Sequence, residues 1–409
     1  MLKKIFTALT VSVLTLSATV STAQIVVEKG AQSDNFVNPT LSFKGISGNS
    51  QLSNSFKKYI SLCGWFDMTN SSNSDYIISG ETTGQTAKLT ITLPNKRTVS
   101  LTTTISGKNS IDMFASKMAD GVIVNLFSKF KVKGICATKF AFCVKRSKSI
   151  KNIFTSNFDG TNVKQLTTSN ILCVEPDWIP NTSNIIYTAY SRSSTSIMES
   201  NIYSKKFRRL THSSGLNNSG DVSPNGKYLA FSMSKKGKVN IFIKNMNGSQ
   251  TTNVTNNNAV TSSPCWSPDG SQLCFTTTTI TTPKLAIINL SNPKIKLLPT
   301  ILDKNYNRAE AVSPTWNALN QIAYSYRVSS NKYGIAVLDL NTGKNKSIVT
   351  ATGSWESPSW APDNRHVICT RTVNSHSSLY IVDTWTKKYR KVLDSPNNLT
   401  EPSWSSILY

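Results

Sequence analysis

A four-residue motif, Pro-x-Trp preceded by Ser or Glu, recurs along the C-terminal part of this 409-residue chain. Five copies are well formed, and a sixth, residues 219–222, has Val222 in place of the tryptophan. The aromatic position falls at residues 178, 222, 266, 316, 360 and 404, in steps of 44, 44, 50, 44 and 44. A period of this length indicates a repeat architecture in which each copy is one supersecondary unit.

Each copy of the motif is followed by a turn and by further strand signals. The best turn is Ser267-Pro268-Asp269-Gly270, in which Pro presets φ and Gly accepts the left-handed conformation. Apolar runs then indicate three more strands, here 273–275, 284–290 and 295–298. Four antiparallel strands per period predict a propeller blade, with the Pro-x-Trp strand innermost and the Trp packed between neighbouring blades. A β-solenoid or a sandwich array is the alternative that this four-strand period disfavours.

The two ends of the repeat region predict how the ring closes. The last copy begins at Glu401, so it leaves no room for three more strands before Tyr409. The strands expected at 139–145, 152–157 and 163–166 lack an inner partner. We therefore expect the C-terminal strand to complete that blade, which gives six blades.

Residues 24–134 lack the repeat. Helical periodicity is present at 52–62 and 111–130, and strand-like runs lie at 76–79, 87–93 and 98–105. The sequence predicts a mainly β protein, with a small α+β domain at 24–134 that begins with a mobile arm, followed by a six-bladed β-propeller at 135–409.

The first 23 residues have the pattern of a cleaved secretory signal. Lys3 and Lys4 precede an apolar segment at 5–16, and small residues follow at 21–23. The apolar segment is short for a bilayer span, although a retained anchor is the alternative. We expect a mature, soluble protein that starts near Gln24 and resides outside the cytoplasm.

The charge is strongly basic, with 45 Lys and Arg against 21 Asp and Glu, a net charge of +24. Such a charge favours nucleic-acid binding in general. Here the basic residues are spread along the chain and the predicted export removes it from nucleic acid, so we expect no such partner. Two explanations of the charge remain: it keeps the protein soluble, or it attracts acidic partners or anionic envelope surfaces.

No recognisable catalytic motif is present. The chain has three histidines, and it lacks a G-x-S-x-G elbow, an HExxH pair and a P-loop. We expect no enzyme, with a propeller hydrolase or lyase that uses Glu356 or His366 as a minor alternative. Seven cysteines leave at least one thiol unpaired in an oxidising compartment, and most are expected to be small core residues.

Acidic residues gather near the expected inner strands. Either they form a functional acidic ring or cation site in the channel, or they only stabilise turns and caps. No cofactor is expected otherwise. The residues concerned are Glu175, Asp177, Asp221, Glu310, Glu356 and Glu401.

The Ser/Glu-Pro-x-Trp-Ser-Pro-Asp-Gly blades, the signal and the domain order resemble the TolB family, the periplasmic propeller component of the Tol–Pal system. The segment Glu401–Ser405 is similar to the family's closing strand, and Ile25–Gly30 is similar to its mature N-terminal strand. The chain departs from the pattern at Val222, and at Trp316, which lacks the Pro-Asp-Gly turn.

The resemblance implies a periplasmic, monomeric scaffold that binds the peptidoglycan-associated lipoprotein Pal and inner-membrane Tol proteins, and supports envelope integrity and division. Loops that enter the inner strands would form the Pal-like face, at Leu216, Asn218, Ser219, Asp221, Ser262, Ser263, Arg308, Glu310, Trp355 and Glu356. The arm at Gln24, Ile25, Val26, Val27 and Glu28 would engage the Tol proteins. A glycan- or peptidoglycan-binding propeller is the other alternative, for which exposed Trp355 and Trp385 would be decisive.

Overall fold

The structure, a computed structural model, describes residues 36–104, 110–192, 194–278, 282–302 and 309–406. Packing separates two compact units, residues 38–122 and residues 123–406 together with 36–37. The expected signal peptide and the arm at Gln24–Glu28 lie outside the described residues. Neither of the described α-helices is long and apolar enough to cross a membrane.

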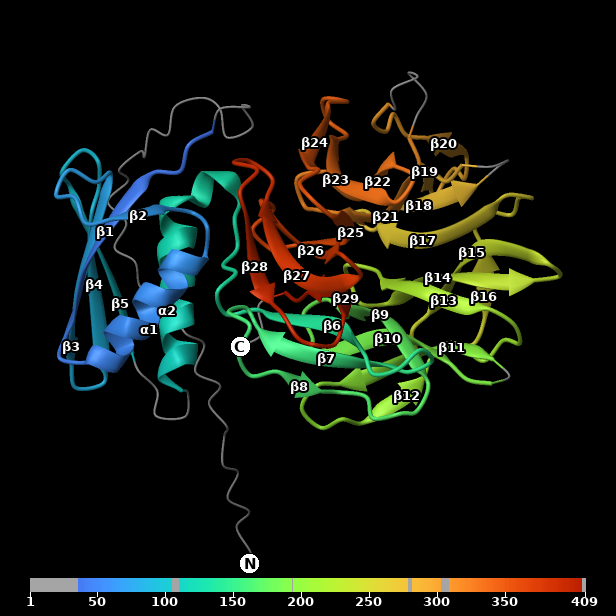
Figure 1. Cartoon of the computed structure of the whole chain (residues 1–409), viewed down its shortest axis with the longest axis horizontal. Coiled ribbons are helices and arrows are strands. Elements are labelled where there is room, and N and C mark those ends of the chain that lie inside the picture. The colour runs from blue at the N-terminus through green and yellow to red at the C-terminus, as the bar shows by residue number, and fades with distance from the viewer. Residues whose placement is uncertain (1–35, 105–109, 193, 279–281, 303–308, 407–409) are drawn as a thin grey trace, which may run out of the picture. The chain divides into compact units, whose positions relative to one another are not determined.

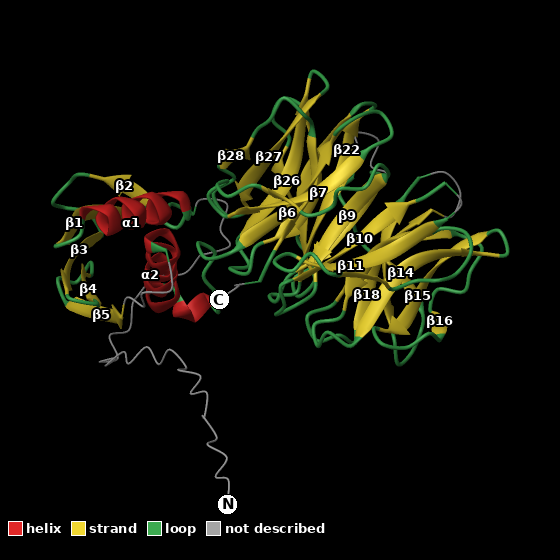
Figure 2. Ribbon diagram, turned by 90° about the horizontal axis from the view of Figure 1, so that it is seen from below, coloured by secondary structure: helices red, strands yellow, loops and turns green. Residues whose placement is uncertain are grey.

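The first unit contains a five-stranded sheet in the order β2-β1-β3-β4-β5. Strand β1 runs parallel to both β2 and β3, and the other pairs are antiparallel. Figure 2 shows the two helices beside this sheet. The elements are β1 (Thr40–Ser47), α1 (Ser50–Leu62), β2 (Asp67–Thr69), β3 (Tyr76–Thr83), β4 (Thr86–Thr92), β5 (Thr98–Thr104) and α2 (Ile111–Leu126), which continues into the second unit.

Helix α1 confirms the prediction made from its apolar spacing. The Asn49 side chain caps it by accepting a hydrogen bond from the Leu52 N–H, which otherwise has no partner in the helix. Its apolar face is buried, and the Phe56 ring lies 5.3 Å from the ring of Phe43 on β1. The predicted helix at 111–130 is observed as α2 and, after a break at Phe127, a short 3₁₀ turn at Ser128–Phe130.

The second unit is a propeller arrangement of antiparallel sheets (Figure 1). Four of these sheets have four strands each, in chain order, as the repeat predicts. They are β13 (Asn217–Val222), β14 (Tyr228–Lys235), β15 (Lys238–Asn245) and β16 (Thr251–Asn253); β17 (Val260–Trp266), β18 (Gln272–Thr278), β19 (Lys284–Asn289) and β20 (Ile295–Leu297); β21 (Ala311–Trp316), β22 (Gln321–Ser329), β23 (Lys332–Asp339) and β24 (Asn345–Val349); and β25 (Ser354–Trp360), β26 (His366–Val373), β27 (His376–Asp383) and β28 (Tyr389–Leu393).

The remaining strands form one eight-stranded sheet, in the order β12-β11-β10-β9-β7-β6-β29 with β8 on β7. Its two halves meet through a single parallel pair, Lys151 with Leu172. The C-terminal strand pairs with β6 from Leu399 to Trp404, which confirms the expected role of that strand. These elements are β6 (Lys139–Lys145), β7 (Lys151–Asn157), β8 (Lys164–Gln165), β9 (Leu172–Trp178), β10 (Asn184–Tyr190), β11 (Thr195–Asn201), β12 (Phe207–Arg209) and β29 (Leu399–Trp404).

The motif tryptophans join successive copies of the repeat. The indole N–H of Trp178 donates to the Ser403 carbonyl at 3.2 Å, and that of Trp266 donates to the Asp221 carbonyl at 3.1 Å. Trp360 repeats the contact with the Thr315 carbonyl. Each acceptor is the residue before the aromatic position in the preceding copy around the ring, so the Trp packs between blades as predicted. Trp316 and Trp404 are the exceptions: the indole of Trp316 donates to Asn320 in its own turn, and the indole of Trp404 donates to the Thr138 hydroxyl.

Basic side chains occupy several outer edge strands. Arg208 and Arg209 of β12, Lys296 of β20 and Lys391 of β28 are exposed. Charged side chains on an edge strand oppose pairing with another chain, because that pairing would bury the charge. Part of the basic composition therefore protects the blade edges.

Candidate functional site

The motif strands surround a cavity of about 720 Å³ in the second unit. Every copy contributes its motif to the wall, which places the Pro-x-Trp strands innermost as predicted. The lining includes the prolines 176, 264, 314, 358 and 402, with Gly220 in the sixth place, and Lys131 and Lys133 from the segment before β6. We call this cavity the channel.

A ring of left-handed residues surrounds the channel. The residue before each motif proline, or before Gly220, has φ between 51° and 54°, and none of the six is glycine. The pairing register with the next strand shifts at each of these positions, which marks a β-bulge. Such a conformation costs about 1–3 kcal/mol per residue, so the surrounding contacts must offset it. The ring residues are Glu175, Ser219, Ser263, Ser313, Ser357 and Glu401.

Carboxylates secure part of this ring. Glu401 Oε2 accepts the N–H of Glu175 at 2.9 Å. Glu175 in turn accepts both the N–H and the hydroxyl of Ser219, at 2.9 and 2.8 Å. Hydrogen bonds to charged acceptors are the stronger kind, so these two glutamates hold three successive motif strands together.

Hydroxyl groups secure two other positions. Ser325 Oγ accepts the Ser357 N–H at 3.1 Å, and Thr370 Oγ1 accepts the Glu401 N–H at 3.0 Å. The equivalent hydroxyls of the other two blades, Ser232 and Thr276, are buried without a hydrogen-bond partner. Among the described residues, side chains therefore bind the backbone N–H of four ring positions, and the two other positions lie beside β14 and β18.

The two ring glutamates differ in their surroundings. Burial raises the pKa of Glu175, against the effect of hydrogen bonds from Ser219 and Thr188. Glu401 forms an ion pair with Lys151 at 2.9 Å. Burial acts to lower the pKa of Lys151, but the charge and hydrogen bond of Glu401 outweigh it and raise that pKa. Lys151 thus neutralises the second ring glutamate.

Two aspartates meet across neighbouring motif strands. Burial raises the pKa of Asp221 well above 3.8, and the nearby charge of Asp177 raises it further. Burial also raises the pKa of Asp177, and a hydrogen bond joins the two carboxyls. Since two ionised carboxylates repel at such contact, the pair holds a shared proton.

The expected acidic ring is present only in part. Glu175, Asp177, Asp221 and Glu401 line the channel, whereas Glu310 and Glu356 are not among its lining residues. No group of three or more His, Cys, Asp or Glu within the described ranges is arranged to hold a metal ion. The channel carboxylates instead bond to Lys151, to hydroxyls, to backbone N–H groups and to each other.

Glu310 belongs to a separate polar cluster on the β21–β24 blade. Its carboxylate pairs with Arg327 at 2.5 Å and accepts the Tyr333 hydroxyl. Burial would raise the pKa of Glu310, but these two hydrogen bonds hold it lower. Glu356 accepts the Ser354 hydroxyl at 2.6 Å. Both predicted contact residues are therefore partly committed to their own blades.

The expectation that Trp355 is exposed is wrong. Its side chain is fully buried, with the rings of Tyr380 and Tyr389 at 5.3 and 5.0 Å. The Arg371 guanidinium lies 5.0 Å from the Trp355 ring. Trp355 follows strand alternation into the blade, so it cannot act as an exposed platform for a sugar.

Trp385 is half-buried and packs in a different cluster. The Arg365 guanidinium lies 4.8 Å from its ring and 5.0 Å from the ring of Phe36, and these two rings pack edge-on with centroids 5.2 Å apart. Phe130 packs edge-on against the same tryptophan, with ring centroids 5.2 Å apart. These contacts occupy the faces that a glycan would need.

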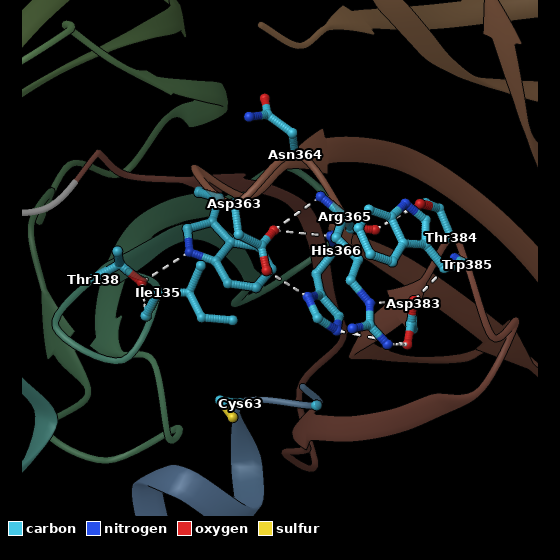
Figure 3. A network of polar contacts seen from close by, with 12 residues as sticks. Cys63, Ile135, Thr138, Asp363, Asn364, Arg365, His366, Asp383, Thr384 and Trp385 are labelled. Atoms are coloured by element: carbon cyan, nitrogen blue, oxygen red, sulfur yellow. Dashed lines mark hydrogen bonds and ion pairs between the residues drawn. The ribbon is translucent and has the colours of Figure 1, made fainter. Parts of the chain in front are cut away.

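His366 lies in the buried polar network beside this cluster (Figure 3). Its Nδ1 is 2.7 Å from Asp363, and Arg365 binds Asp383 through two hydrogen bonds of 3.0 and 2.6 Å. Burial would raise the pKa of Asp383, but the charges of His366 and Arg365 hold it well below its usual value. This network joins the turn after the motif to β27, which is a structural role for His366.

The residues predicted for the Pal-like face fall into three groups. Ser219, Asp221 and Ser263 line the channel, and Leu216, Asn218 and Ser262 are half-buried near them in sequence. Glu310, Glu356 and Trp355 are described above. Arg308 lies outside the described residues, as do the arm residues 24–28.

Several site residues were not predicted from the sequence. Lys151 sits in an ordinary strand pattern, and no local signal indicates that it faces Glu401. The repeated Ser or Glu before each proline was visible, but its left-handed conformation was not expected, because the residue before proline usually adopts an extended backbone.

The fold and the channel define a β-propeller with a hydrogen-bonded inner ring. The family model described as the TolB beta propeller domain matches residues 130–408, and the chain belongs to that family. A comparison with curated protein sequences finds no match.

Solved structures share the fold. TolB from Acinetobacter baumannii is 18% identical with a TM-score of 0.79, and the match covers 90% of this chain and 97% of that one. A putative TolB from Agrobacterium tumefaciens is 12% identical with a TM-score of 0.51, covering 64% and 90%. Hydrazine synthase from Kuenenia stuttgartiensis is 13% identical with a TM-score of 0.56, covering 68% and 48%.

Proposed function

We propose that the chain is a periplasmic protein-binding scaffold of the Tol–Pal type, which supports outer-membrane integrity and constriction of the envelope at division. Family membership supports a Tol–Pal-type role at the level of the family. In this proposal the eight-stranded sheet counts as two blades, β29-β6-β7-β8 and β9–β12, so that the propeller has six.

The observation that carries the proposal is the convergence of predicted contact residues on one opening. Ser219 and Asp221 of β13 and Ser263 of β17 come from different blades, yet they line the same channel. A Pal-like lipoprotein would bind across this face, and the arm near Gln24 would engage inner-membrane Tol proteins. The working form would be a monomer without a catalytic residue.

A calorimetric titration of the mature protein with the soluble domain of a Pal-like lipoprotein from the same organism tests this proposal. We expect saturable binding that Ser262→Glu weakens at least tenfold, because Ser262 is half-buried and directly precedes Ser263 of the channel wall, so that a larger charged side chain alters that surface. Ser249→Glu, the same change in an exposed turn after β15, should leave the affinity unchanged. Absence of binding by the unaltered protein would refute the proposal.

The two alternatives have less support. Glycan binding lacks its expected platform, because Trp355 is buried and Trp385 is covered by Phe36, Phe130 and Arg365. A hydrolase or lyase that uses His366 would need that side chain at a surface, whereas it is 2% exposed.

A further inference from the structure

Two cysteines face each other across the β17–β18 strand pair. Cys265 is directly opposite Cys274 in the antiparallel register. Opposite residues in such a pair lie on the same face with Cα atoms about 4.5–5.5 Å apart, which is within the span of a disulfide. Both thiols belong to one core cluster, and a hydrogen bond joins them.

This pairing is peculiar to one blade. Elsewhere around the ring the position of Cys265 holds Asp, Thr or Ser, and the residue opposite is Ile or Ala. In the closing blade, for example, the pair is Ser403 with Ala141. The blade fold therefore accepts residues without sulfur at both places.

The two cysteines differ in their position relative to the channel. Cys265 lines the channel wall and is 7% exposed, whereas Cys274 is fully buried behind it. A reagent that reaches Cys265 leaves Cys274 in position to attack the same sulfur. None of the other five cysteines is paired with a cysteine in the strand registers.

We propose that Cys265 and Cys274 form a redox-sensitive disulfide when a small-molecule disulfide enters the channel. The Cys265 thiolate attacks one sulfur of the oxidant, breaks its S–S bond and releases one thiol. Cys274 then loses its proton, attacks the Cys265 sulfur of the mixed disulfide and releases the second thiol. The protein gains one S–S bond and loses two thiol protons, and the oxidant is reduced to two thiols.

The chemistry should be slow. Burial raises the pKa of the Cys265 thiol well above 9.0, and the hydrogen-bonded Cys274 and the charges of Asp221 and Asp177 raise it further. Because the thiolate is the attacking species, the reduced form persists until an oxidant is in excess.

The test is to incubate the reduced, folded full chain with hydroxyethyl disulfide, then to count thiols after denaturation and map cross-linked peptides by mass spectrometry. We expect the count to fall from seven to five, with a single cross-link between Cys265 and Cys274. Cys265→Ser should retain its six thiols without a cross-link. If that variant does not fold, Cys274→Ala should stop at the mixed disulfide, with five thiols, one adduct of the reagent on Cys265 and no cross-link between cysteines.

The double variant Cys265→Ser/Cys274→Ala is the matched control, because it reproduces the Ser403 and Ala141 pair of the closing blade. It should keep five thiols throughout. A wild-type count that stays at seven, or a cross-link between any other two cysteines, would overturn the proposal.

Discussion

Replacement of Trp404 by alanine tests whether the C-terminal strand closes the propeller. Trp404 is 5% exposed and packs edge-on against Phe140 with ring centroids 4.9 Å apart. Its indole N–H donates to the Thr138 hydroxyl at 2.8 Å. Removing a buried aromatic side chain of this size costs about 3–5 kcal/mol, since it deletes apolar contacts and leaves a cavity. We expect a loss of that size in the free energy of unfolding.

Two other substitutions set the scale for this loss. Trp404→Phe keeps an aromatic ring and removes the indole hydrogen bond, so it should cost about 1 kcal/mol beyond the small change in packing. Trp316→Ala should cost about 2 kcal/mol, because Trp316 is only half-buried and its indole bonds within its own turn. The series therefore separates burial at the closing blade from the mere presence of a motif tryptophan.

Chemical denaturation followed by far-ultraviolet circular dichroism measures these differences, with the dependence on denaturant compared among the variants. Because the chain has two compact units, tryptophan fluorescence should be recorded alongside it, since seven of the eight tryptophans lie in the second unit and only Trp65 in the first. If Trp404→Ala loses no more stability than Trp316→Ala, the closing role of β29 is refuted.

Two further predictions concern buried charges. Asp221→Asn should flatten the pH dependence of stability. The folded protein keeps the proton that Asp221 shares with Asp177 above pH 3.8, whereas the unfolded chain releases it there. The stabilisation that this proton gives the folded protein is lost as pH rises through the raised pKa. Urea titrations between pH 4 and pH 8 measure the slope, and Asp269→Asn in an exposed turn should not flatten it; an unchanged slope in the first variant contradicts the shared proton. Asp383→Asn should lower the free energy of unfolding by about 3–5 kcal/mol because the buried guanidinium of Arg365 loses its counter-charge, and thermal unfolding without a clear shift would contradict that pairing.

Much of the propeller could be predicted because bulky and turn-forming residues recur at fixed positions of its repeat. The Trp spacing, the Ser267–Gly270 turn and the unmatched strand at 139–145 determine the blades and the pairing of β29 with β6. Helix α1 was predictable for a similar reason, since its apolar residues recur at helical spacing.

The chemistry of the site was harder to predict, because it depends on contacts between residues far apart in the sequence. Glu175 and Glu401 are 226 positions apart, yet one carboxylate accepts the backbone N–H of the other residue. Whether Trp355 faces solvent depends on Arg371, Tyr380 and Tyr389 above it, and no local pattern indicates that cover. Site residues on single strands were therefore found only in part.

Site-specific photo-crosslinking in cells tests the central claim most directly. With a photoreactive amino acid in place of Ser262, beside the channel, irradiation should yield an adduct with a peptidoglycan-binding lipoprotein of the outer membrane. The same amino acid at Ser249 should yield none. An equal yield of that adduct from both positions, or no lipoprotein adduct from Ser262 in a folded and exported protein, would contradict binding through this face of the propeller.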